Sequence, residues 1–136
     1  MLSPTAATIR LTLRVLAACI WVGGQFTLGA LVPVLRGYEG VTKVAARAFN
    51  RLAWPAFVVL VLTGVWNLME VDVTDAPTAY QVTVFVKILV AAASGIAAAA
   101  HINATTKVAL AVGGAVGALT AIAAVFLGVL LRAGSY

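Results

Sequence analysis

The sequence predicts an all-α integral membrane protein, built as an antiparallel bundle of four transmembrane helices. Of its 136 residues, 63% are hydrophobic and only 10% are charged, whereas a soluble domain carries about 25% charged residues. Four stretches of 18 to 24 residues hold at most one charge each, and a helix needs about 20 residues to cross a bilayer. These stretches and their short connections account for the whole sequence, so we expect one domain, residues 1–136, in contact with the lipid bilayer.

The first predicted span covers residues 15–35, which are 21 residues without a charge. A cleaved signal peptide has an apolar region of about 7–15 residues, so the longer run favours a retained helix. The connection 36–51 follows and contains four cations. Apolar residues recur along it at helical spacing, which predicts a short amphipathic helix at the membrane surface between the first two spans. These apolar residues are Val41, Val44, Ala45, Ala48, Phe49 and Leu52.

The second predicted span covers residues 52–69, which are 18 residues without a charge. Pro55 then falls in its first turn, where a missing backbone N–H costs little. Trp54 and Trp66 lie near the two ends of the span, where aromatic belts form at membrane interfaces. An acidic connection that contains Pro77 separates this span from the third.

The third and fourth predicted spans cover residues 82–100 and 108–131, with 19 and 24 residues. Small residues recur in both at a spacing of four, as in the pair Gly113 and Gly117 of the fourth span. Helices in lipid approach each other closely through such small residues, so we expect these two helices to be direct neighbours. The matching pairs in the third span are Ser94 with Ala98 and Gly95 with Ala99.

Lysines and arginines indicate the orientation, because they are enriched in cytoplasmic connections. With alternating helices, five cations fall on the side of the first and third connections and four fall on the other side. We therefore predict that the connection 36–51 is cytoplasmic and that both termini lie outside. The five are Arg36, Lys43, Arg47, Arg51 and Lys107, and the four are Arg10, Arg14, Lys87 and Arg132.

The composition also excludes several classes of function. The net charge of +5 comes without a basic run that is interleaved with aromatic residues, so we expect no nucleic-acid partner. The single cysteine, Cys19, permits no internal disulfide and no cysteine cage for a metal. The single histidine, His101, has no serine or cysteine near it that would complete a hydrolytic triad. The sequence therefore favours a non-enzymatic function.

Lys87 is the only charged residue inside a predicted span, and a charge at the centre of a membrane helix costs about 2.5–3.5 kcal/mol. One interpretation is snorkelling, because Lys87 lies about five residues into its span and its stem can carry the ammonium to the interface. The other is a cationic ligand site, suited to an anion or a carboxylate-bearing ligand, in which Glu70 or Asp72 comes within salt-bridge reach of Lys87 or Arg14. The candidate binding residues are Arg14, Trp21, Lys87, Glu70 and Asp72.

Four short motifs carry a resemblance to a known family. They are WVGG at 21–24, FNRLA at 49–53, LVLTGVWN at 60–67 and VKILV at 86–90. In this order and spacing they resemble the copper-resistance D (CopD) family of bacterial inner-membrane proteins and, more distantly, the HemJ-type protoporphyrinogen oxidases of the same superfamily. The resemblance implies an inner-membrane location and a role in copper uptake or resistance. The HemJ-type branch is a haem-binding oxidase that uses a first-helix histidine and a third-helix lysine.

The chain departs from these relatives at the position seven residues before Trp21. They carry a histidine there, whereas this chain has Arg14, and arginine has no lone pair to offer a metal. His101 is a weak metal candidate, because it lies at the opposite end of the third span from Lys87. Copper and haem b are therefore candidate cofactors, and neither has a full set of ligands in the sequence.

The residues and the resemblance together predict a small copper-homeostasis or transport component of the membrane. Such a component would act as a homo-oligomer or with a partner in a membrane complex. One alternative is a haem-associated redox protein related to the HemJ-type oxidases. The other is a structural or assembly subunit of a membrane complex.

Overall fold

The structure is a computed structural model that describes residues 3–134, and within this range every regular element is a helix. Four continuous helical segments of 25 to 30 residues are long and apolar enough to cross a membrane. The prediction of an all-α chain with four long apolar helices is therefore confirmed. The elements are α1 (Ala6–Ala18), the π-helical segment η1 (Cys19–Gly23), α2 (Gly24–Leu35), α3 (Val41–Glu70), α4 (Thr78–Ile102) and α5 (Lys107–Ala133).

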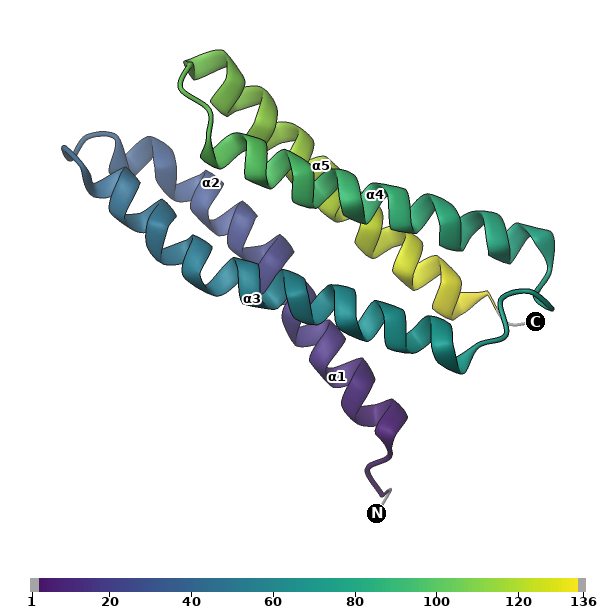
Figure 1. Cartoon of the computed structure of the whole chain (residues 1–136). Coiled ribbons are helices and arrows are strands. Elements are labelled where there is room, and N and C mark those ends of the chain that lie inside the picture. The colour runs from purple at the N-terminus through teal and green to yellow at the C-terminus, as the bar shows by residue number, and fades with distance from the viewer. Residues whose placement is uncertain (1–2, 135–136) are drawn as a thin grey trace. The chain divides into compact units, whose positions relative to one another are not determined.

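Contacts between residues divide the chain after Val71 into two compact units, and each unit is a helical hairpin. In the first hairpin, α1, η1 and α2 form one rod that packs against α3 (Figure 1). In the second hairpin, α4 packs along α5 (Figure 1). The prediction that the helices of the third and fourth spans are direct neighbours is therefore confirmed.

Local sequence signals explain where several helices begin. Thr5 and Thr8 form a capping box at the start of α1, in which the Thr8 backbone N–H donates to the Thr5 hydroxyl at 3.2 Å. Thr106 caps α5 by accepting a hydrogen bond from the Ala109 backbone N–H at 3.1 Å. Gly40 precedes α3 with φ of +75°, a left-handed conformation that suits glycine.

The expected short surface helix between the first two spans is not a separate element. From Val41 onward the chain continues without a break to Glu70, so the cationic segment forms the first turns of α3. Residues 41–54 contain neither glycine nor proline, and charged side chains on one face do not interrupt backbone hydrogen bonds. Pro55 consequently lies inside α3 rather than in a first turn. Its missing N–H is tolerated in membrane helices, where neighbouring groups satisfy the freed carbonyl.

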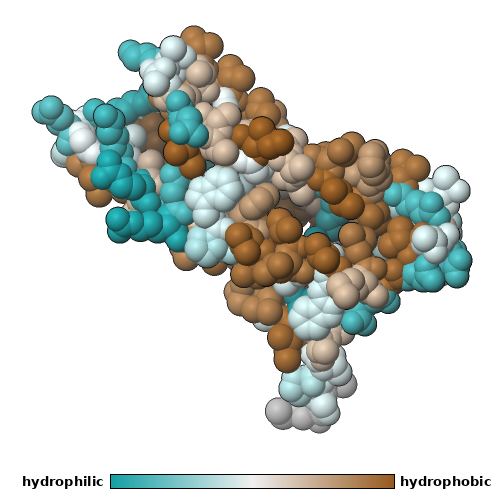
Figure 2. Space-filling view, in the orientation of Figure 1, coloured by the Kyte–Doolittle hydropathy of each residue, from teal (hydrophilic) through white to brown (hydrophobic). Residues whose placement is uncertain are grey.

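Large apolar side chains cover much of the outer surface of both hairpins (Figure 2). Phe26 is 53% exposed, Phe85 62% and Phe126 65%. An extended apolar surface of this kind marks a site of contact with a membrane or with another protein. This apolar surface and the four long apolar helices are typical of a multi-pass membrane protein.

Candidate functional site

Arg14 is the most unusual residue of the first hairpin. It lies eight residues, about 12 Å, beyond the start of α1. Its Nη1 nitrogen is buried and has no hydrogen-bond partner within residues 3–134. The same nitrogen lies 3.2 Å from the position that a Cβ would take at Gly64 of α3. The absence of a side chain at Gly64 therefore leaves room for the guanidinium group between the two helices.

Trp21 lies two turns further along, in the π-helical segment η1, and is only 4% exposed. Its ring centroid lies 4.6 Å from that of Phe57 and 5.8 Å from that of Trp54. Trp54 was expected near the end of a span; it lies inside α3, which begins at Val41, and its ring packs against that of Trp21. Its place in an aromatic belt stays a prediction. A π-helical turn inserts one extra residue and is frequent at functional sites.

Glu70 pairs with Arg10 rather than with Arg14. The carboxylate lies 3.8 Å from Arg10 Nη1 and accepts a hydrogen bond from the Trp66 indole N–H at 3.2 Å. The Arg10 guanidinium lies 5.4 Å from the centre of the Trp66 ring, within the range of a cation–π contact. These three residues tie the first helix to the end of α3. Trp66 remains exposed there, as an interfacial aromatic residue would be.

Asp72 begins the connection to the second hairpin and is exposed. Its carboxylate accepts hydrogen bonds from the Thr74 hydroxyl at 2.6 Å and from the Thr74 backbone N–H at 3.2 Å. The side-chain hydrogen bond from Thr74 holds the pKa of Asp72 below its ordinary value. Asp72 thereby stabilises a local turn.

Lys87 lies deeper in its helix than the sequence suggested. Since α4 begins at Thr78, Lys87 is nine residues, about 14 Å, beyond its start, rather than five. Its Nζ nitrogen lies 3.3 Å, and its Cε 3.7 Å, from the position that a Cβ would take at Gly128 of α5. The side chain therefore extends along the neighbouring helix. Pairing of Lys87 with an acid stays a prediction.

His101 lies in the last turn of α4, where its ring fits against two glycines of α5. A Cβ at Gly113 would lie 3.1 Å from the His101 Cβ, and a Cβ at Gly114 would lie 3.4 Å from its Cε1. The two glycines together therefore leave room for His101, while Gly117 is buried one turn further along α5. The His101 Nδ1 is buried, and it has no hydrogen-bond partner among the residues that the structure describes. No group of three His, Cys, Asp or Glu side chains within residues 3–134 could hold a metal ion.

The candidate residues are thus divided between the two hairpins. Arg14, Trp21 and Glu70 belong to the first, and Asp72 and Lys87 belong to the second. Sequence reasoning identified Arg14 as a cation close to an apolar run, but it missed Gly64 and Arg10. Gly64 had no distinguishing signal in the sequence, because a glycine in a membrane span is common. What the first hairpin offers chemically is a cationic hydrogen-bond donor in apolar surroundings, the chemistry of anion binding.

No protein-family model, no curated protein and no solved structure matches this chain. The resemblance to the CopD family therefore rests on the four short motifs alone, of which WVGG forms the turn from η1 into α2.

Proposed function

We propose that the chain is a multi-pass protein of the bacterial inner membrane whose four helices form an antiparallel bundle. In this proposal it serves as a small transport component of the CopD-like type and binds an anionic or carboxylate-bearing ligand at Arg14. The observation that carries the proposal is the buried Nη1 nitrogen of Arg14, to which no group in the described part of the chain is hydrogen-bonded. Ionisable side chains inside membrane spans commonly mark the pathway of a substrate or an ion.

The chemistry of arginine favours an anion at this position. Its guanidinium is protonated at every physiological pH and cannot become neutral to escape the cost of burial. Desolvating a charged group costs several kcal/mol even after relaxation, and an anionic ligand offsets that cost. The planar guanidinium donates two parallel hydrogen bonds to a carboxylate. The aromatic cluster of Trp21, Trp54 and Phe57, on the same two helices, supplies an apolar wall for the body of such a ligand.

Thermal unfolding of the detergent-purified protein tests this proposal. Acetate and benzoate, compared with chloride at constant ionic strength, should raise the unfolding temperature of the wild type. A ligand at 100 times its dissociation constant stabilises by about 2.7 kcal/mol. The Arg14→Gln variant should lose this anion effect, while Arg36→Gln, at an exposed arginine beyond α2, should keep it. Equal stabilisation of all three proteins by the carboxylates would refute a site at Arg14.

Lys87→Met provides a second measurement on the same protein. We expect transport to be abolished, because an ionisable side chain inside a membrane span commonly lies on the pathway of a substrate. The unfolding temperature without ligand should stay near that of the wild type, because methionine keeps an unbranched stem beside Gly128. Unchanged transport by this variant would show that Lys87 has no part in the function.

Metal analysis and an absorption spectrum of the purified protein separate the proposal from its rivals. A Soret band would indicate a haem-associated redox protein, and copper in a fixed ratio to the chain would indicate a copper-homeostasis component. Stable co-purification of another membrane protein would indicate a structural or assembly subunit.

The proposed orientation predicts a specific labelling pattern. In a Cys19→Ala background, a cysteine at Thr74 should react with a membrane-impermeant thiol reagent added to whole cells. A cysteine at Lys43 should react only after the membrane is opened. The reason is that the cations of residues 36–51 favour the cytoplasmic side. Labelling in the reverse order would place both termini in the cytoplasm.

A further inference from the structure

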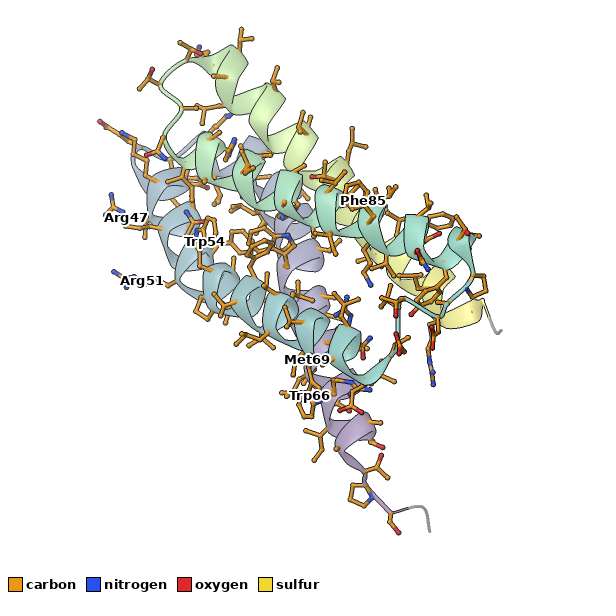
Figure 3. The ribbon with its side chains drawn as sticks, turned by 45° about the vertical axis from the view of Figure 1, so that its right-hand side comes forward. Arg47, Arg51, Trp54, Trp66, Met69 and Phe85 are labelled. Atoms are coloured by element: carbon orange, nitrogen blue, oxygen red, sulfur yellow. The ribbon has the colours of Figure 1, made fainter. Side chains whose placement is uncertain are left out.

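A row of three cations follows one face of the first turns of α3. Lys43, Arg47 and Arg51 recur at intervals of four residues, and all three are exposed. We call them the basic ridge. Residues at this spacing lie one above the other on a helix. Figure 3 shows Arg47 and Arg51 projecting from the same side of α3, away from the ribbon.

An apolar groove lies between α1 and α3, with a cavity volume of about 240 Å³. We call it the α1–α3 groove. All eight residues that line it have apolar side chains, although the chain carries charged residues on both helices. Its lining consists of Leu13, Leu16, Ala17 and Ile20 from the first helical rod, with Leu52, Pro55, Ala56 and Val59 from α3.

The Arg51 end of the basic ridge lies next to the residues of α3 that line the α1–α3 groove. Pro55 and Val59 continue the four-residue interval beyond Arg51, and both line the groove. Leu52, which also lines the groove, directly follows Arg51, and Pro55 lies one turn of α3, about 6 Å, beyond that last cation. A molecule with an anionic head and an apolar tail matches this order of surfaces.

The electrostatics of the ridge also favour an anion. Like charges at a spacing of four residues destabilise a helix, and the ridge contains two such pairs. Neither Arg47 nor Arg51 makes an ion pair within residues 3–134. Membrane orientation requires cations in this part of the chain, but it does not require them to line up with an apolar groove.

We infer that the basic ridge and the α1–α3 groove form a binding site for an anionic phospholipid. Arg47 and Arg51 hold the phosphate, and one acyl chain lies in the groove along Pro55 and Val59. Clusters of Lys and Arg beside a membrane helix recognise anionic lipid headgroups by this chemistry. The inference rests on the membrane insertion proposed above and is independent of ligand binding at Arg14.

Native mass spectrometry of the detergent-purified protein tests the site, with phosphatidylglycerol and phosphatidylcholine of the same chain length added in equal amounts. The wild type should retain phosphatidylglycerol preferentially. Each basic residue near a membrane surface contributes about 1 kcal/mol to anionic-lipid binding. The double variant Arg47→Gln/Arg51→Gln should therefore bind phosphatidylglycerol roughly 30-fold more weakly, since each 1.4 kcal/mol is a tenfold change in affinity. The matched control is Arg36→Gln/Arg132→Gln, which removes the same charge at exposed positions off the ridge and should retain phosphatidylglycerol as the wild type does.

A second variant tests the groove separately from the charges. Leu16 lines the groove and is 57% exposed, so Leu16→Trp can cover the groove without entering the contact between the helices. It should weaken retention of dioleoyl phosphatidylglycerol much more than retention of the dihexanoyl form, whose chains are short.

Several outcomes would overturn the lipid site. Equal retention of the two headgroups by the wild type would show that the ridge does not select an anion. A control variant that loses as much lipid as the ridge variant would show an effect of net charge alone. Lipid-free dimers of the chain would show that a second copy covers the groove. Recovery of the protein in soluble form without detergent would contradict the proposed membrane insertion. This result differs from the three above, which concern the lipid site alone.

Discussion

Replacing Gly24 with alanine is expected to destabilise the first hairpin by about 1–3 kcal/mol, the usual cost of overpacking. A Cβ at this position would overlap the ring of Phe49, whose Cδ2 and Cζ atoms would both lie 3.1 Å from it. An aromatic ring is rigid, so either the ring or the helix must move. Gly24 belongs to the WVGG motif and Phe49 begins the FNRLA motif. The contact therefore couples two of the segments that carry the family resemblance.

Gly23→Ala is a matched control for this substitution. Gly23 is the preceding residue of the same helical rod, and nothing lies within 4 Å of a Cβ built there. Since alanine favours a helix over glycine by about 1 kcal/mol, Gly23→Ala should leave stability unchanged or raise it slightly. Thermal unfolding of both variants in the same detergent measures this difference in stability. Equal unfolding temperatures for the two variants would show that Phe49 does not pack against Gly24.

The second large effect is expected in the second hairpin, where Gly117→Leu should destabilise the protein by a few kcal/mol. Gly117 and Ala121 are the buried residues of α5, and a leucine side chain would need room that a buried position lacks. Overpacking forces side chains away from their preferred rotamers and shifts the backbone, at a cost of about 1–3 kcal/mol and sometimes more. Close approach through small residues is also what holds membrane helices together.

Ala115→Leu serves as the control for Gly117→Leu, because Ala115 is an exposed residue of α5 only two positions earlier. A leucine there adds apolar surface on the outside of the helix and should leave the unfolding temperature in detergent unchanged. If Gly117→Leu also left the unfolding temperature unchanged, the Gly117 face of α5 would be exposed to lipid and not packed against another helix.

The sequence by itself determined the helical class and the number of long apolar helices. Both follow from local properties, namely the length of the uncharged runs and the scarcity of polar residues. The small residues of the last two spans also predicted correctly that α4 and α5 are neighbours. A short connection keeps two consecutive helices next to each other, and small side chains allow their backbones to approach closely.

Helix boundaries were less predictable, because charge and helicity are separate properties. The cations of residues 36–51 mark where a chain leaves an apolar environment, yet a helix continues as long as its backbone hydrogen bonds do. As a result α3 begins at Val41 rather than at residue 52, and α4 begins at Thr78 rather than at residue 82. These shifts carry Pro55 into the helix interior and place Lys87 further along α4 than expected.

For the candidate site, too, the sequence pointed to individual residues and not to their contacts. The sequence pointed to Trp21 through the WVGG motif of the family resemblance and to Arg14 as the residue seven positions before it. Only the tertiary structure decided what they touch: Gly64 makes room for the guanidinium, and Phe57 packs against the indole. It also decided that Glu70 pairs with Arg10. These contacts join residues about 35 to 60 positions apart. Their register is set by which side chains fit between two helices, a property of shapes that meet only after folding.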